Sequence, residues 1–148
     1  MREIVLTFTI AELVKLVSCC NHAIVNCNEE IRANGEIKFT TNGVTARDSL
    51  VKIWSVKDKL KYAMIKHMSA GSKSADIIIK MDITDVIKLN GCCNSLMADN
   101  EKMIDICGSD TDIASSLKQE IQIVMEIKNK IKRTLNSIYG DVATFNVT

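Results

Sequence analysis

The chain has no proline, only six glycines and an aromatic content of 4% among its 148 residues. Without proline, nothing in the sequence forces a kink inside a long helix. Few aromatic residues leave no series of stacking platforms of the kind that single-strand nucleic-acid binders use. The net charge of +1 excludes a globally basic nucleic-acid-binding protein, although a local basic face remains compatible with it.

Long uncharged apolar runs and the common catalytic motifs are also absent from the sequence. No such run approaches the roughly 20 residues of a bilayer-spanning helix, which argues against a transmembrane protein. There is no glycine-rich phosphate loop, nucleophile elbow or metalloprotease helix. With 47% hydrophobic and 25% charged residues, the composition is that of a globular domain. We therefore expect a non-enzymatic protein with no catalytic residues, metal or cofactor, and no association with membranes.

Six cysteines include two adjacent pairs, Cys19-Cys20 and Cys92-Cys93, both in segments with helical periodicity. Neighbouring helical side chains point about 100° apart, so the members of a pair cannot bridge each other. No signal peptide is evident in residues 1–7, and we expect free, buried thiols in the reducing cytoplasm. The alternative is a zinc site, in which Cys19 and His22 join Cys92 and Cys93. Against it, Ser95 stands at the position equivalent to His22.

An internal duplication is the strongest pattern in the sequence. When the chain is shifted by 73 residues, residues 2–31 align without gaps on residues 75–104, and eight of the 30 positions are identical, among them Cys19-Cys20-Asn21 and Cys92-Cys93-Asn94. The pattern predicts one domain, residues 1–148, built from a first repeat (1–73) and a second repeat (74–148).

Each repeat is predicted to contain a strand and two helices. The strands are residues 4–8 and 77–81, and the first helices begin after the caps Thr9-x-x-Glu12 and Asp82-x-x-Asp85. The second helices are expected at about 46–70 and 113–139, capped by Thr45 with Asp48 and by Asp110 or Asp112. Glycines just past the helices mark their ends at Gly35, Gly71, Gly108 and Gly140.

Two further strands are expected, residues 36–41 as an insertion in the first repeat and residues 141–147 at the end of the second. The predicted fold is α+β, with four helices packed on a small, mostly antiparallel sheet and related by pseudo-twofold symmetry. Apolar residues predicted on the inner side of the second helix are Leu50, Ile53, Trp54, Leu60, Ala63, Met64 and Met68.

Charge is segregated between the helices, because the second helix of each repeat is basic and the first is acidic. One interpretation is a solvated outer face with partly compensating neighbours. The other is a positive surface for an acidic protein, a nucleic acid or a phosphorylated ligand. The candidate binding residues of this basic face are Arg47, Lys52, Lys57, Lys59, Lys61, Lys66, Lys128, Lys130, Lys132 and Arg133.

The opening Ile4-Val5-Leu6-Thr7, with Thr9-x-x-Glu12 and the helix that follows, resembles small accessory proteins of phages and mobile elements in low-GC bacteria. This resemblance implies a binding function, such as a phage inhibitor (an anti-CRISPR) that occludes a host protein or defence complex in the host cytoplasm. The partner would be an acidic host protein or nucleoprotein complex, bound through the basic face or through an edge strand containing Phe39 or Phe145.

Two other functions remain open on sequence grounds. One is an oligomeric binder of nucleotides or oligonucleotides that uses Lys57, Lys61, Lys128 and Lys132. The other is a structural homo-oligomer whose protomers exchange the C-terminal strand.

Overall fold

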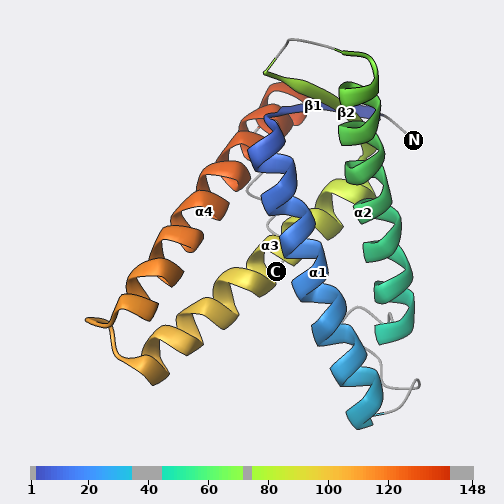
Figure 1. Ribbon diagram of the computed structural model, residues 1–148. Coiled ribbons are helices and arrows are strands. Elements are labelled where there is room, and N and C mark those ends of the chain that lie inside the picture. Colours follow the sequence, from blue (N-terminus) through green and yellow to red (C-terminus); the bar gives the residue numbers. More distant parts are fainter. Residues whose placement is uncertain (1–2, 35–44, 72–74, 141–148) are drawn as a thin grey trace.

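Four long helices and a two-stranded antiparallel sheet form the described part of the computed structural model, residues 3–34, 45–71 and 75–140. The α+β prediction with a small antiparallel sheet is confirmed at this level. The elements in chain order are β1 (Glu3–Phe8), α1 (Ile10–Asn34), α2 (Ala46–Ser69), β2 (Ile77–Asp82), α3 (Ile83–Cys107) and α4 (Asp112–Tyr139). The sheet lies at one end, α1 and α3 cross beneath it, and α2 and α4 flank this crossing (Figure 1).

The sheet turns one apolar face toward the helices. β1 and β2 are antiparallel, with Leu6 opposite Ile79 and Glu3 opposite Asp82. Alternate residues of each strand are buried, as the twofold side-chain period of a strand requires. The buried set is Ile4, Leu6, Phe8, Ile77, Ile79 and Met81.

The helices begin at polar caps, most of them as predicted. The Thr9 hydroxyl accepts a hydrogen bond from the Glu12 backbone N–H (3.1 Å), and the Glu12 carboxylate accepts one from the Thr9 N–H (2.8 Å). Asp82 and Asp85 form the equivalent capping box before α3, and Thr45 caps α2. The expected cap of α4 was wrong. Thr111 is its N-cap, since its hydroxyl accepts from the N–H of Ala114.

The helix ends coincide with glycines in the left-handed region of backbone space. Gly108 (φ 91°) follows α3 and Gly140 (φ 80°) follows α4. Both helices therefore stop where only glycine avoids strain. Gly35 and the strands expected at 36–41 and 141–147 lie outside the described residues.

One hydrophobic core contains residues from all six elements. From α2 it takes Ile53, Val56, Leu60 and Ala63, with Leu50 and Met64 packed against it. Trp54 and Met68 were expected on this inner side, but their exposed fractions are 45% and 68%. Apolar residues therefore occupy two sides of α2, and only one of them is buried.

Candidate functional site

The predicted binding residues on the second helices fall into three groups: ion-paired, half-buried and exposed. The ion-paired lysines, which we call the inner group, are bound to carboxylates at the starts of the first helices. Lys52 and Lys59 of α2 both donate to the fully buried Asp85, at Nζ–O distances of 2.7 and 2.5 Å. Lys130 of α4 donates to Glu12 at 2.7 Å. A buried carboxylate needs such partners because its desolvation is otherwise unfavourable. These three basic residues thus serve the protein's own structure.

The ionisation of Asp85 and Glu12 reflects this pairing. Burial alone would raise the pKa of Asp85, but hydrogen bonds from Lys52, Lys59 and the Asp82 backbone outweigh it and hold that pKa below its usual range. For Glu12, burial is again outweighed, here by Lys130 and Thr9, and the pKa is lowered. Both groups are therefore carboxylates at neutral pH.

Two more of the predicted binding residues are half-buried. Lys128 donates to the Asn94 side-chain oxygen, and burial lowers the pKa of Lys128. The ammonium of Lys57 lies 4.4 Å from the centre of the Trp54 ring, within the range of a cation–π contact.

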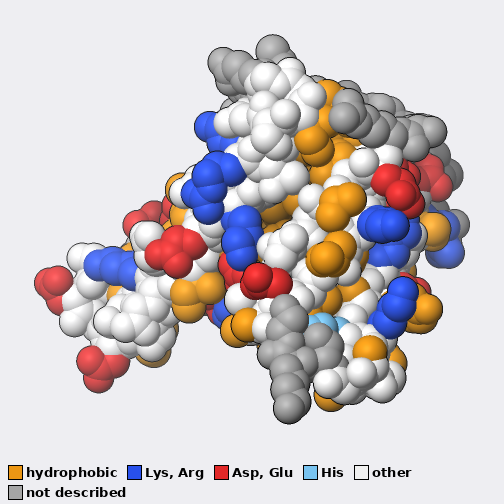
Figure 2. All heavy atoms as spheres, turned by 90° about the horizontal axis from the view of Figure 1, so that it is seen from above, with side chains coloured by type: hydrophobic (Ala, Val, Ile, Leu, Met, Phe, Trp, Pro, Cys, Tyr) orange, Lys and Arg blue, Asp and Glu red, His pale blue; other side chains and the backbone are white. Residues whose placement is uncertain are grey.

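The outer group keeps its charge on the surface. Lys61, Lys66, Lys132 and Arg133 are exposed, as is Arg47 at the start of α2. The face of the molecule that carries the sheet shows an apolar band with both basic and acidic side chains on either side of it (Figure 2).

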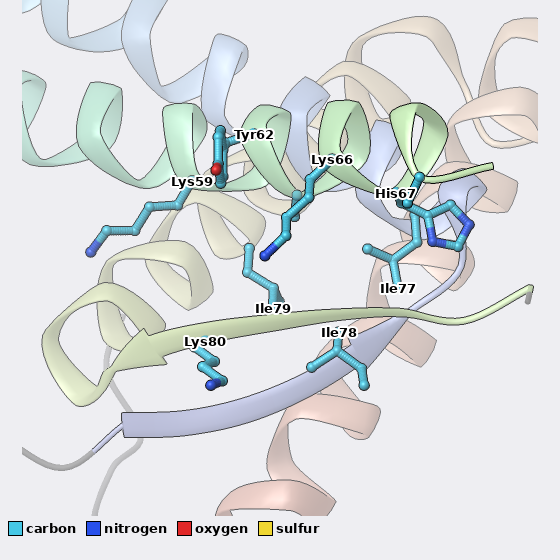
Figure 3. A pocket seen from close by; sticks show the side chains of 10 residues that line it. Lys59, Tyr62, Lys66, His67, Ile77, Ile78, Ile79 and Lys80 are labelled. Atoms are coloured by element: carbon cyan, nitrogen blue, oxygen red, sulfur yellow. The ribbon is translucent and has the colours of Figure 1, made fainter. Parts of the chain in front are cut away.

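A groove of about 500 Å³ lies between α2 and β2. Lys59 and Lys66 extend from α2 over this groove, and His67 lies at one end of it (Figure 3). Lys80 of β2 completes the basic lining, and among the described residues no aspartate or glutamate lines the groove. We call it the α2/β2 groove.

The floor of the α2/β2 groove is apolar. Ile77 and Ile79 point from β2 toward α2, where Ala63 belongs to the same lining (Figure 3). Tyr62 is the aromatic residue of the lining. A largely apolar recess with a few charged groups at its rim is typical of a binding site.

Sequence reasoning identified Lys59 and Lys66 but missed Lys80 and His67. Lys80 is a solvent-facing residue in an alternating strand, which is an ordinary position for a lysine. Only the packing of α2 beside β2 makes it part of a shared lining.

Four cysteines meet where α1 crosses α3. Cys20 lies beside Cys92 and Cys19 beside Cys93, and all four side chains are buried. The contact with Cys92 together with burial raises the pKa of Cys20, and the contact with Cys19 together with burial raises that of Cys93. A raised pKa makes the Cys20 and Cys93 thiols poor nucleophiles, because the thiolate is the reactive form.

The zinc alternative gains no support. His22 pairs with Asp99 (Nε2–Oδ2 2.5 Å) and not with the thiols. Across the part of the chain that the structure describes, no three His, Cys, Asp or Glu side chains are placed to hold a metal ion.

α1 is long and apolar enough over Ile10–Ala33 to cross a membrane, judged by length and composition. In the fold its apolar face packs on α2 and α3, where Leu13, Leu16 and Ala23 are buried. A core helix of a globular protein passes the same test.

No protein-family model, curated protein or solved structure matches the chain.

Proposed function

We propose that the chain is a non-enzymatic binding protein that holds an acidic surface of another protein against α2 and β2. The observation that carries this proposal is the lining of the α2/β2 groove, in which Lys66 and Lys80 are exposed beside a histidine and no described lining residue is an aspartate or a glutamate. Lysine without arginine favours diffuse attraction to acidic groups over bidentate recognition of phosphate or bases.

The biological role that we propose is a phage-type inhibitor of the anti-CRISPR kind, which occludes a host protein or defence complex in the cytoplasm. It combines the basic groove with the resemblance of residues 4–12 to phage accessory proteins. Six free cysteines agree with a reducing compartment.

The test is capture of a partner from a bacterial lysate, followed by reconstitution with the purified partner. We expect an acidic protein that forms a stable complex on a sizing column and loses its own activity when bound. The charge-reversal variant Lys66→Glu/Lys80→Glu should weaken this complex, because both side chains are exposed and line the groove. A purified partner that binds this variant as tightly as the wild type would refute the proposal.

A homo-oligomer is the second candidate, because α2 carries a second apolar stripe on its exposed side. The stripe recurs at helical spacing and consists of Val51, Trp54, Tyr62, Ile65 and Met68. Light scattering across a hundredfold range of concentration tests it. A monomer throughout would exclude it.

Nucleotide binding by Lys57, Lys61, Lys128 and Lys132 has weaker support. Lys57 and Lys61 belong to α2 and Lys128 and Lys132 to α4, and these two helices lie on either side of the crossing of α1 and α3 (Figure 1). Thermal-shift measurements with a nucleotide panel would test this alternative.

We also propose that the two halves descend from one duplicated β-α-α unit related by a pseudo-twofold axis. The strand register supports this, since a 73-residue shift relates Leu6 to Ile79, which pair with each other. The same shift exchanges the Cys19–Cys93 contact with the Cys20–Cys92 contact.

The ion pairs support the duplication as well. The 73-residue shift relates Glu12 to Asp85. The lysines bound to them, Lys130 and Lys59, are related by a shift of 71 residues, which also aligns the buried Val56 and Leu60 of α2 with Ile127 and Ile131 of α4. An experimental structure tests the proposal. Residues 3–31 should superpose on 76–104 by a rotation close to 180°, and an unrelated arrangement would contradict it.

A further inference from the structure

We propose that the α2/β2 groove binds an extended segment of the acidic partner, which adds to the free edge of β2 as a third strand. This inference rests on the proposed function and specifies what part of the partner is recognised. Among the described residues β2 pairs only with β1, and no described strand pairs with its other edge. A strand edge of this kind offers N–H and C=O groups to an added strand. That edge faces the groove beneath α2 (Figure 3).

The shape of the groove fits an extended chain. Its lining on α2 runs from Lys59 to Ala70, a distance of about 16 Å at 1.5 Å per helical residue. About five residues of a strand, at roughly 3.3 Å each, span the same distance. On the other side the lining consists of four consecutive residues of β2, Ile77 to Lys80. An extended segment running along β2 would therefore contact both walls.

The side chains of the groove predict which sequence would bind. Successive side chains of a strand point to opposite faces. On one face an added strand would meet the apolar floor at Ala63, Ile77 and Ile79. On the other face it would meet Lys80, with Lys66 at the mouth of the groove. The matching ligand alternates apolar and acidic residues.

Lys66 and Lys80 are the cations available to such a ligand. Lys59 already donates to Asp85, so its charge is committed within the protein. Among the described residues, Lys66 and Lys80 form no ion pair, and both are exposed. A single-stranded nucleic acid is disfavoured, because Tyr62 is the one aromatic side chain among the described lining residues and stacking usually needs several.

The experiment uses the full-length protein and a fluorescent peptide of about seven residues that alternates glutamate and valine. We expect saturable binding by anisotropy, with a Kd of about 1 mM or tighter. Amide resonances of Ile78 and Lys80 should shift in NMR spectra. A lysine–valine peptide and an oligothymidylate of similar length serve as comparison ligands and should bind at least about tenfold more weakly.

Two sets of variants separate strand addition from simple charge attraction. Lys66→Glu/Lys80→Glu should weaken peptide binding by about tenfold or more. The matched control Lys102→Glu/Lys118→Glu reverses two exposed lysines outside the groove and should change binding by no more than about twofold. Circular dichroism checks that each variant is folded.

Two N-methylated peptides, blocked at odd or at even positions, test the backbone pairing. One of them should lose about tenfold in affinity and the other should bind nearly as the parent, because alternate N–H groups face β2. The inference is overturned if neither loses affinity, if the control variant loses as much as the groove variant, or if the oligothymidylate binds better than the peptide. It also fails if no peptide binding saturates.

Failure of this inference differs from failure of the proposed function. If the purified partner depends on Lys66 and Lys80 but the peptide results are negative, the basic surface remains the binding site and strand addition is wrong. If the purified partner binds the Lys66→Glu/Lys80→Glu variant as tightly as the wild type, the proposed function itself is wrong.

Discussion

Replacing Asp85 with asparagine should destabilise the fold, because Asp85 is a fully buried carboxylate whose charge is compensated by two lysines. Its exposed fraction is 0%, and it accepts hydrogen bonds from Lys52, Lys59 and the backbone N–H of Asp82. Asparagine has nearly the same volume and keeps one accepting oxygen. It removes the charge, so the change isolates the electrostatic contribution.

The expected cost is about 2 kcal/mol. Removing one partner of a fully buried ion pair costs about 3–5 kcal/mol, because the other charge is left unpaired. Here the side chains of Lys52 and Lys59 are 32% and 42% exposed, so both can turn toward water and recover part of their solvation. With a urea m-value of about 2 kcal/mol/M, the unfolding midpoint should fall by about 1 M.

Urea unfolding at pH 7, followed by circular dichroism, measures the effect. Asp58→Asn, on the exposed side of α2, is the matched control and should leave the midpoint unchanged. Glu12→Gln, which removes a carboxylate with one lysine partner, should cost about 1 kcal/mol. Adding Lys59→Met to Asp85→Asn should recover part of the loss. A midpoint for Asp85→Asn equal to that of the Asp58→Asn control would refute the reasoning.

Three further predictions concern pH, glycines and thiols. Carboxylates with lowered folded-state pKa values, such as Glu12 and Asp85, stabilise the fold above their unfolded pKa of about 4, so urea midpoints should fall as the pH drops from about 4 toward 2. Gly91→Ala, inside α3 with open space around the added Cβ, should stabilise by about 0.5–1 kcal/mol, whereas Gly108→Ala (φ 91°) should destabilise by about 1 kcal/mol. Native protein should expose at most Cys27 and Cys107 to a thiol reagent, and urea should expose all six cysteines.

Local rules predicted most of the secondary structure. The capping residues Thr9, Thr45 and Asp82 and the terminal glycines act through hydrogen bonds and backbone angles within a few residues, which a sequence displays directly. The fourth cap was misplaced because Asp110, Thr111 and Asp112 are three successive residues of capping type, and periodicity does not choose among them.

Tertiary packing determines which side of α2 is buried, and the sequence pattern alone does not. α2 has apolar residues on two sides, Ile53 and Leu60 on one and Val51 and Ile65 on the other, and both sets recur at helical spacing. Only the position of α1 and the sheet determines which set is buried, so Trp54 and Met68 were assigned to the wrong side. The α2/β2 groove was missed for the same reason, since its walls are separated in sequence and meet only in the fold.

The basic residues predicted from the charge pattern of the sequence thus differ in their partners within the protein. Lys52, Lys59 and Lys130 neutralise carboxylates of the protein, and Lys128 is held by an amide. Their charges are largely cancelled or half-buried, so they add little to the field that a partner meets. The attraction that remains comes from a few exposed lysines such as Lys66. The affinity for the partner should therefore fall with salt only as much as expected for a contact that involves two or three charges. If substitution of each of the ten predicted residues weakened binding, the ion pairs of Lys52, Lys59 and Lys130 would have to open when the partner binds.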